Sequence, residues 1–271
     1  MSGADINSDP IRVNRNVAAA NRSLAGPGPE ALRKVGACFG WKLAANNSSV
    51  DENTKTRRTW GPREWAILSG EGIDIGCGPD PLTPEVQRFD LEHGDANEIT
   101  KFVRRQFDFV YSSHCLEHMH QPQAAILEWW QLVKPGGHLF VIVPDEDLYE
   151  QGVFPSRFNP DHKATFTISK TKSWSPVSVN LQALMSSLPN SKVIAIDLHD
   201  RGYDRNQAFH GPTKQPGFIL RPLRRIYFAL KHRGHLHWPV IERMLSAYSP
   251  RDQTLYPDTQ AQIQCIVQKL A

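Results

Sequence analysis

The chain has 271 residues, which is enough for one large domain or for one domain with additions. Its 40% hydrophobic and 22% charged residues are ordinary for a globular protein, and a net charge of +3 is too small to demand a nucleic-acid partner. The four cysteines are scattered without a C-x-x-C pair, which argues against a disulfide framework or a zinc site. There is neither an apolar run of about 18 residues nor an apolar signal segment, so we expect a cytoplasmic protein.

The first 60 residues are predicted to form an N-terminal arm and a helix, and residues 61–271 the main domain. Residues 1–30 are rich in Asn, Ala, Arg, Gly and Pro, which is typical of an irregular arm. A helical spacing follows over residues 30–43. Trp60-Gly61-Pro62 then introduces a short helix that leads into the first strand.

A glycine-bearing turn follows that strand. The apolar residues 72–75 contain one acid, Asp74, and run into Gly76-Cys77-Gly78, as when a parallel β-strand ends in a ligand-binding turn. Glycine can adopt positive φ and lets a ligand approach the backbone closely. A dinucleotide-binding fingerprint, G-x-G-x-x-G, has a third glycine after this turn. Here Pro79 follows Gly78 and the third glycine is missing, which excludes a dinucleotide site of that kind.

Two acidic residues come next, each in a short turn. Residues 86–89 are predicted to form a strand ending at Asp90, whose carboxylate could accept hydrogen bonds from both ribose hydroxyls of a ligand. Prolines at 79, 81 and 84 exclude a full helix before this strand. Gly94-Asp95-Ala96 follows. The alternative is that Asp90 and Asp95 are solvated loop carboxylates.

The segment from residue 107 to 144 carries a further set of motifs. A strand (107–111) runs into Ser112-Ser113-His114-Cys115-Leu116-Glu117-His118; a helix, the turn Lys134-Pro135-Gly136-Gly137 and a buried strand (138–143) follow. Together with D-I-G-C-G at 74–78, this order resembles class I S-adenosylmethionine-dependent methyltransferases, in particular the methyltransferase type 11-like family. The resemblance covers about residues 70–145.

The resemblance implies an α/β fold, with a seven-stranded, doubly wound, Rossmann-like sheet whose last strand is antiparallel, and S-adenosyl-L-methionine as cofactor. It also implies a set of cofactor-binding residues in the turns after the first, second and fourth strands. These are Asp74, Gly76, Cys77, Gly78, Asp90, Asp95, Ala96, Ser112 and Ser113.

Four residues near the expected sheet edge are candidates for the general base that such a transfer needs when the acceptor must lose a proton. They are His114, His118, Asp145 and His162. His118 could instead be a structural hydrogen-bonding residue. Asp145 and the two acids after it could orient a substrate amine, coordinate a divalent ion, cap a helix or be solvated. We predict no metal site.

The C-terminal part is predicted to contain a helix (175–188), a strand (193–197), an insertion (200–258) and a last strand (261–270). The alternation of Ile263, Cys265 and Val267 with glutamines indicates an exposed or one-sided antiparallel strand. Between residues 201 and 243 there are nine Lys or Arg but two acids, and residues 221–232 have the spacing of a basic amphipathic helix. This helix could be a solvated lid, attract an anionic substrate, or contact a membrane surface or another subunit.

The predicted activity is transfer of a methyl group to an oxygen or nitrogen atom of a small-molecule or glycan acceptor. Because the insertion is basic, we expect this acceptor to be anionic. A nucleic-acid methyltransferase is the first alternative, but no [DN]-P-P-[YFW] signature follows the strand at 107–111. A non-catalytic scaffold that binds the cofactor is the second.

Overall fold

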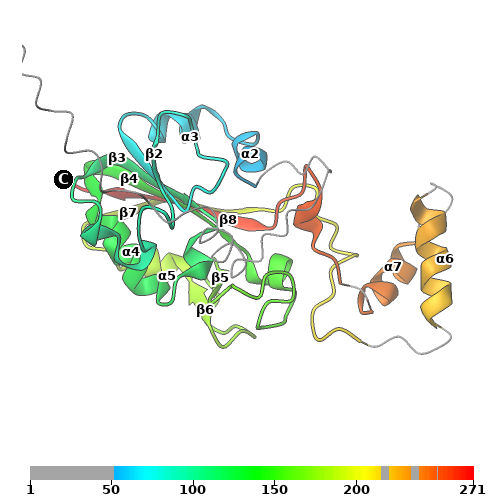
Figure 1. Ribbon diagram of the computed structural model, residues 1–271. Helices are drawn as coiled ribbons and strands as arrows, with labels where there is room; N and C mark the ends of the chain where they lie inside the picture. Colours follow the sequence, from blue (N-terminus) through cyan, green and yellow to red (C-terminus); the bar gives the residue numbers. More distant parts are fainter. Residues whose placement is uncertain (1–51, 215–219, 233–237, 249) are drawn as a thin grey trace, which may run out of the picture. The chain divides into compact units, whose positions relative to one another are not determined.

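The computed structural model describes residues 52–214, 220–232, 238–248 and 250–271. Its main sheet has six strands in the order β2-β1-β3-β4-β8-β7 (Figure 1). The strands are β1 (Gly72–Ile75), β2 (Gln87–Phe89), β3 (Phe107–Ser113), β4 (Val133–Pro144), β7 (Ser191–His199) and β8 (Gln262–Lys269). Strands β1 to β4 pair in parallel, whereas β8 is antiparallel to both β4 and β7. The predicted α/β class and antiparallel last strand are confirmed.

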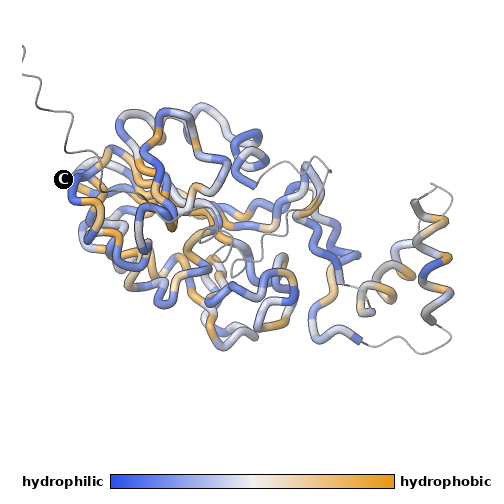
Figure 2. The backbone as a smooth tube through the Cα atoms, viewed as in Figure 1, coloured by the Kyte–Doolittle hydropathy of each residue, from blue (hydrophilic) through white to orange (hydrophobic). Residues whose placement is uncertain are grey.

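Helices cover both faces of this sheet (Figure 1). On one face, α4 (Pro122–Gln131) and α5 (Leu181–Ser186) pack over a hydrophobic cluster that includes Ile73, Val141 and Trp129. On the other, Trp60 and the end of α3 (Pro62–Ile67) pack over Tyr111 and Phe140. Figure 2 shows the hydrophobic residues concentrated in the strands between these layers. Each face of the sheet therefore packs in its own hydrophobic cluster, as in a doubly wound fold.

The position of β8 differs from the expectation of an exposed or one-sided strand. It lies between β4 and β7, and residues 262–267 are all buried. The glutamines are buried because they have polar partners in the N-terminal segment. Gln264 Oε1 accepts from Trp60 Nε1 at 2.8 Å, and Gln262 Nε2 donates to Thr56 Oγ1 of α2 (Glu52–Arg57) at 2.8 Å. The alternating polar residues of β8 are therefore explained by hydrogen bonds to the layer that covers the sheet, and not by exposure to solvent.

The expected count of seven strands is also corrected: the main sheet has six in the described part of the chain. Between β2 and β3 the chain forms a 3₁₀ helix, η1 (Ala96–Lys101), and no strand. Asp95 caps this helix by accepting a hydrogen bond from the backbone N–H of Asn97. The connection between β2 and β3, where a further strand would have to lie, is therefore occupied by this helical turn.

The remaining elements lie near the C-terminal half of the chain. The predicted helix at 175–188 is shorter than expected, because β6 (Ser178–Asn180) pairs with β5 (Thr165–Thr167) and Asn180 then caps α5. The insertion contains α6 (Leu220–His232) and α7 (Pro239–Ser246), so its predicted amphipathic helix is confirmed. The helix predicted at 30–43 lies outside the described residues, and the domain boundary at residue 60 stays a prediction. None of the described helices is both long enough and apolar enough to cross a membrane.

Candidate active site

The glycine turn after β1 is held against the neighbouring strand ends. Gly76 (φ 74°) and Gly78 (φ 53°) both have positive φ. The Gly76 N–H donates to the Phe89 carbonyl at 2.8 Å, and the Gly78 N–H donates to Asp90 Oδ2 at 2.7 Å. A Cβ on Gly76 would lie 2.5 Å from Cys115 Sγ. Glycine is therefore required here for packing against the segment after β3, in addition to the predicted room for a ligand.

Asp74 organises the same turn from inside the sheet. Its side chain is buried, and its Oδ2 accepts from the Leu82 N–H at 2.7 Å. Burial raises the pKa of Asp74 to about 7, although the Leu82 hydrogen bond and the charge of Arg57 act in the opposite direction. Cys77, also buried, lies 3.4 Å from the Nε of Arg88. Asp74, in β1, and Cys77, in the turn after it, thus each have a polar contact near the turn.

The other predicted cofactor residues lie at the ends of β2 and β3. Asp95 is exposed, and its hydrogen bonds from Asn97 lower its pKa. The carbonyl of Ala96 accepts from Trp129 Nε1 at 2.9 Å. Ser112 is fully buried and its Oγ donates to the Ile75 carbonyl at 2.9 Å, while Ser113 is half-buried at the end of β3. Ser112 therefore joins β3 to β1.

His114 begins the segment after β3 in a left-handed conformation (φ 53°). Its Nε2 lies 3.0 Å from Gln262 Oε1, and its Nδ1 lies 3.4 Å from Glu117 Oε1. Burial alone would lower the pKa of His114, but the hydrogen bond and charge of Glu117, with Glu52 and Gln262, raise it to about 9. This pKa favours the protonated ring at neutral pH, and the role of His114 as a general base stays a prediction.

His118 and His162 meet although 43 residues separate them in the chain. The backbone N–H groups of Lys163 and Ala164 donate to the Glu117 carbonyl at 2.8 and 3.2 Å, which ties the loop after β4 to the turn after β3. The two imidazole rings are edge to face with their centroids 5.0 Å apart. One side-chain ligand atom from each of Glu117, His118 and His162 lies within 4.8 Å of the others. We call these three residues the histidine cluster.

Each ring of the cluster also has a carboxylate partner. His118 Nδ1 lies 2.9 Å from Asp161 Oδ2, and the buried His162 has its Nδ1 2.6 Å from Glu150 Oε1. Glu117, Glu150 and Asp161 were not among the predicted site residues. The L-E-H and N-P-D-H-K motifs contain Glu117 and Asp161 and could have indicated them, whereas Glu150 lies in neither motif.

Asp145, the fourth candidate base, ends β4 and caps a π-helical turn, η3 (Glu146–Glu150). Its Oδ1 accepts from the N–H groups of Asp147 and Leu148 at 3.1 and 3.0 Å. Burial raises the pKa of Asp145 to about 6, against the effect of the Leu148 hydrogen bond. Of the roles considered for this acidic run, helix capping is the one that the structure shows for Asp145.

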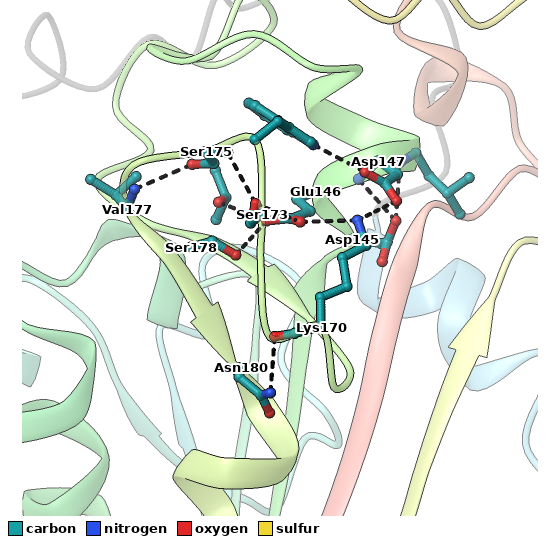
Figure 3. A network of polar contacts seen from close by, with 12 residues as sticks. Asp145, Glu146, Asp147, Lys170, Ser173, Ser175, Val177, Ser178 and Asn180 are labelled. Carbon is teal, nitrogen blue, oxygen red and sulfur yellow. Dashed lines mark hydrogen bonds and ion pairs between the residues drawn. The ribbon is translucent and has the colours of Figure 1, made fainter.

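The next acid, Glu146, is fully buried in a network of polar contacts (Figure 3). Its Oε1 accepts from Lys170 Nζ at 3.0 Å and from Ser173 Oγ at 2.8 Å. Its Oε2 accepts from Ser178 Oγ at 2.5 Å and Thr165 Oγ1 at 3.2 Å. The network fastens β5, β6 and the loop between them to the end of β4.

Comparison with known proteins supports this architecture. Residues 53–204, more than half of the chain, match the family described as "Methyltransferase domain" (Methyltransf_23). A curated relative, the ubiquinone biosynthesis O-methyltransferase of Aromatoleum aromaticum, is 23% identical over 128 residues. That match covers 37% of this chain and 55% of the relative, so the chain spans about half the length of the protein it matches.

The comparison with solved structures found matches of low identity and low TM-score. A SAM-dependent methyltransferase from Archaeoglobus fulgidus is 14% identical with a TM-score of 0.40, covering 80% of this chain and 93% of that one. Phosphoethanolamine N-methyltransferase 2 from Haemonchus contortus is also 14% identical with a TM-score of 0.38, covering 77% and 52%. These similarities are weak, so the assignment rests on the family match. The chain belongs to the methyltransferase-domain family.

Proposed function

We propose that this methyltransferase transfers the methyl group to an anionic small-molecule or glycan acceptor. The observation that supports the location of the site in this proposal is the contact between the Gly76–Gly78 turn and Cys115, where a Cβ on Gly76 would lie 2.5 Å from the sulfur. Cys115 stands between His114 and Glu117. The proposed cofactor turn and the histidine cluster are therefore neighbours at the carboxyl edge of the parallel strands, where ligands bind in such sheets.

In this proposal the turn after β1 receives the methionyl part of the cofactor and Asp90 receives the ribose. Asp90 Oδ2 already accepts from the Gly78 N–H, which fixes the carboxylate beside the turn. In the same proposal, Asp95 and Ala96 contact the adenine ring of the cofactor. Ser112 is buried and bonded to Ile75, so its contribution is to hold the strand ends together.

Methyl transfer needs alignment and, for a hydroxyl acceptor, loss of a proton. The acceptor oxygen gives up its proton and forms a bond to the methyl carbon as the carbon–sulfur bond breaks. The electron pair of that bond stays on sulfur, which leaves S-adenosylhomocysteine. Since the two ring nitrogens of His114 face Gln262 and Glu117, and Asp145 caps a helix, we assign acceptor deprotonation to the histidine cluster.

The nature of the acceptor is supported by two observations. The curated relative is an O-methyltransferase, which favours an oxygen acceptor. The basic insertion between residues 201 and 243 favours a negatively charged one. Peripheral membrane contact remains an alternative role for α6, on which Leu223, Ile226 and Leu230 are exposed. A cytoplasmic location stays a prediction, supported by three buried free thiols at Cys77, Cys115 and Cys265.

The proposal is tested by incubating the protein with S-adenosylmethionine labelled in its methyl group and an extract separated into small molecules, glycans, nucleic acids and proteins. Label in the small-molecule or glycan fraction, retained on an anion exchanger, is expected. Label in nucleic acid or protein, or in no fraction while the cofactor binds, would contradict it. Asp90→Asn should raise KM for the cofactor, and Glu92→Gln, a change at an exposed neighbour, should leave it unaltered.

A further inference from the structure

We propose that Glu117, His118 and His162 bind a divalent transition-metal ion. The sequence alone predicted no metal site, and the two histidines lie in separate motifs. The fold brings together one ligand atom from each residue within 4.8 Å of the others. Two imidazoles and one carboxylate form a three-ligand set that leaves further coordination positions open.

The carboxylate partners of the rings favour this assignment. Asp161 lies at Nδ1 of His118 and Glu150 lies at Nδ1 of His162, so Nε2 is the nitrogen that each ring has available for a ligand. Metal-bound histidines characteristically donate their other ring N–H to a carboxylate, which fixes the ring and makes it a better ligand. Both histidines of the cluster have this arrangement.

The third ligand carries an independent indication. Glu117 is 1% exposed, and its Oε2 is buried without a hydrogen-bond partner, while Oε1 faces His114. A buried carboxylate oxygen without a partner is destabilising. A metal ion bound between Glu117 and the two rings would supply the missing interaction.

The donor set also selects the class of metal. Imidazole nitrogens suit Zn²⁺, Co²⁺ and related ions, whereas Mg²⁺ and Ca²⁺ prefer oxygen ligands. Cys115 does not belong to the set, since its sulfur packs on Gly76. An ion about 2.1 Å from each ligand needs ligand atoms about 3.4 Å apart, so atoms that lie up to 4.8 Å apart must close by up to about 1.4 Å.

The open positions give the ion a use in the proposed reaction, and this part of the inference rests on the proposed function. An acceptor oxygen bound to the metal would be held at the edge of the cofactor turn with its acidity increased. The metal would then lower the pKa of the bound acceptor hydroxyl, whose proton would pass to solvent water instead of to a free histidine base.

Metal binding is tested on the full chain after removal of metals with a chelator. Titration with Zn²⁺ by calorimetry, and with Co²⁺ by visible absorption, should show one ion per chain. Glu117→Gln and His162→Gln should each lower affinity by at least about 100-fold. Asp161→Asn, a milder change at a half-buried partner of His118, should lower it by about 10–100-fold.

His120→Gln, an exposed histidine close by, is the matched control and should bind as the parent does. Absence of metal binding by the parent chain, or unchanged affinity in Asp161→Asn and in the folded ligand variants, would overturn the inference. Cofactor binding is measured on the same samples. Metal binding without methyl transfer would contradict the proposed function alone, and transfer without metal binding would contradict the metal site alone.

Discussion

Asp74 shows how the position of a single carboxyl group sets its charge. The sequence places it in an apolar strand, and the structure buries it with one backbone hydrogen bond, from Leu82. Desolvation disfavours the carboxylate more than this bond favours it, so the pKa of Asp74 rises from 3.8 to about 7. The folded protein therefore keeps a proton on Asp74 over a pH range in which the unfolded chain has lost it.

This difference predicts a pH effect on the free energy of unfolding. Between pH 3.8 and about 7 the folded state binds more protons at Asp74, so the contribution of Asp74 to stability decreases as pH rises, by up to about 4 kcal/mol. Asp74→Asn should remove this decrease, because an amide keeps the acceptor for Leu82 without titrating. Urea unfolding from pH 4 to 8 checks it, with Glu92→Gln as control. An equal slope in the parent and Asp74→Asn would refute the assignment.

The candidate site could be predicted only in part at the scale of residues. The turn at Gly76 and Gly78 and the histidines were predicted, because each lies in a compact motif after a strand. The pairings of His162 with Glu150 and His118 with Asp161 depend on how the loop after β4 folds back onto Glu117. No local spacing encodes that contact.

At the scale of elements, the Glu146 network fastens β5 and β6 to the sheet (Figure 3). Glu146→Gln should lower the free energy of unfolding by about 1.5–3 kcal/mol, because the neutral amide loses the charged bond to Lys170 and offers two donors to hydroxyls. Asp147→Asn is the matched control. Its carboxylate also pairs with Lys170 but is 38% exposed, so a smaller loss is expected. Equal losses in urea unfolding would show that burial of Glu146 is unimportant.

Helix α6 is the element with the clearest functional alternatives. Arg225 is exposed, and the side chains of Arg221 and Arg224 lie outside the described residues. Replacing all three by Gln should raise KM for an anionic acceptor without changing cofactor affinity. The effect should shrink with added salt, because exposed charges are screened within about 10 Å at 0.1 M ionic strength.

The control for this prediction replaces Lys101, Arg104 and Lys192, which are exposed cations outside the insertion, by Gln. An equal rise of KM in the control would mean that net charge, rather than α6, attracts the acceptor. Unchanged KM in the α6 variant, combined with lost binding to anionic vesicles, would instead assign α6 to a membrane surface.

At the level of the whole molecule, the presence of the main strands was predicted from the sequence, whereas the burial of the last strand was not. Buried apolar runs predicted β1, β3 and β4, and their parallel pairing. The buried position of β8 was missed, because Gln262 and Gln264 are satisfied by Thr56 and Trp60 about 200 residues away. Burial of polar residues depends on partners that local pattern does not reveal.

The proposed cofactor turn and the histidine cluster follow strand ends of one sheet. Cofactor binding through the turn after β1 and Asp90 is the claim on which the other assignments depend. Replacing Asp90 by Asn removes the negative charge while keeping the size of the side chain. Loss of a hydrogen bond to a charged group is expected to weaken binding by about 1.5–3 kcal/mol, or roughly 10–150-fold in Kd.

Calorimetric titration of the parent chain, Asp90→Asn and Glu92→Gln with S-adenosylmethionine is the most direct measurement. We expect binding by the parent, an increase in Kd of roughly 10–150-fold for Asp90→Asn, and no change for Glu92→Gln. Equal affinities in all three folded proteins would contradict the placement of the cofactor at this turn.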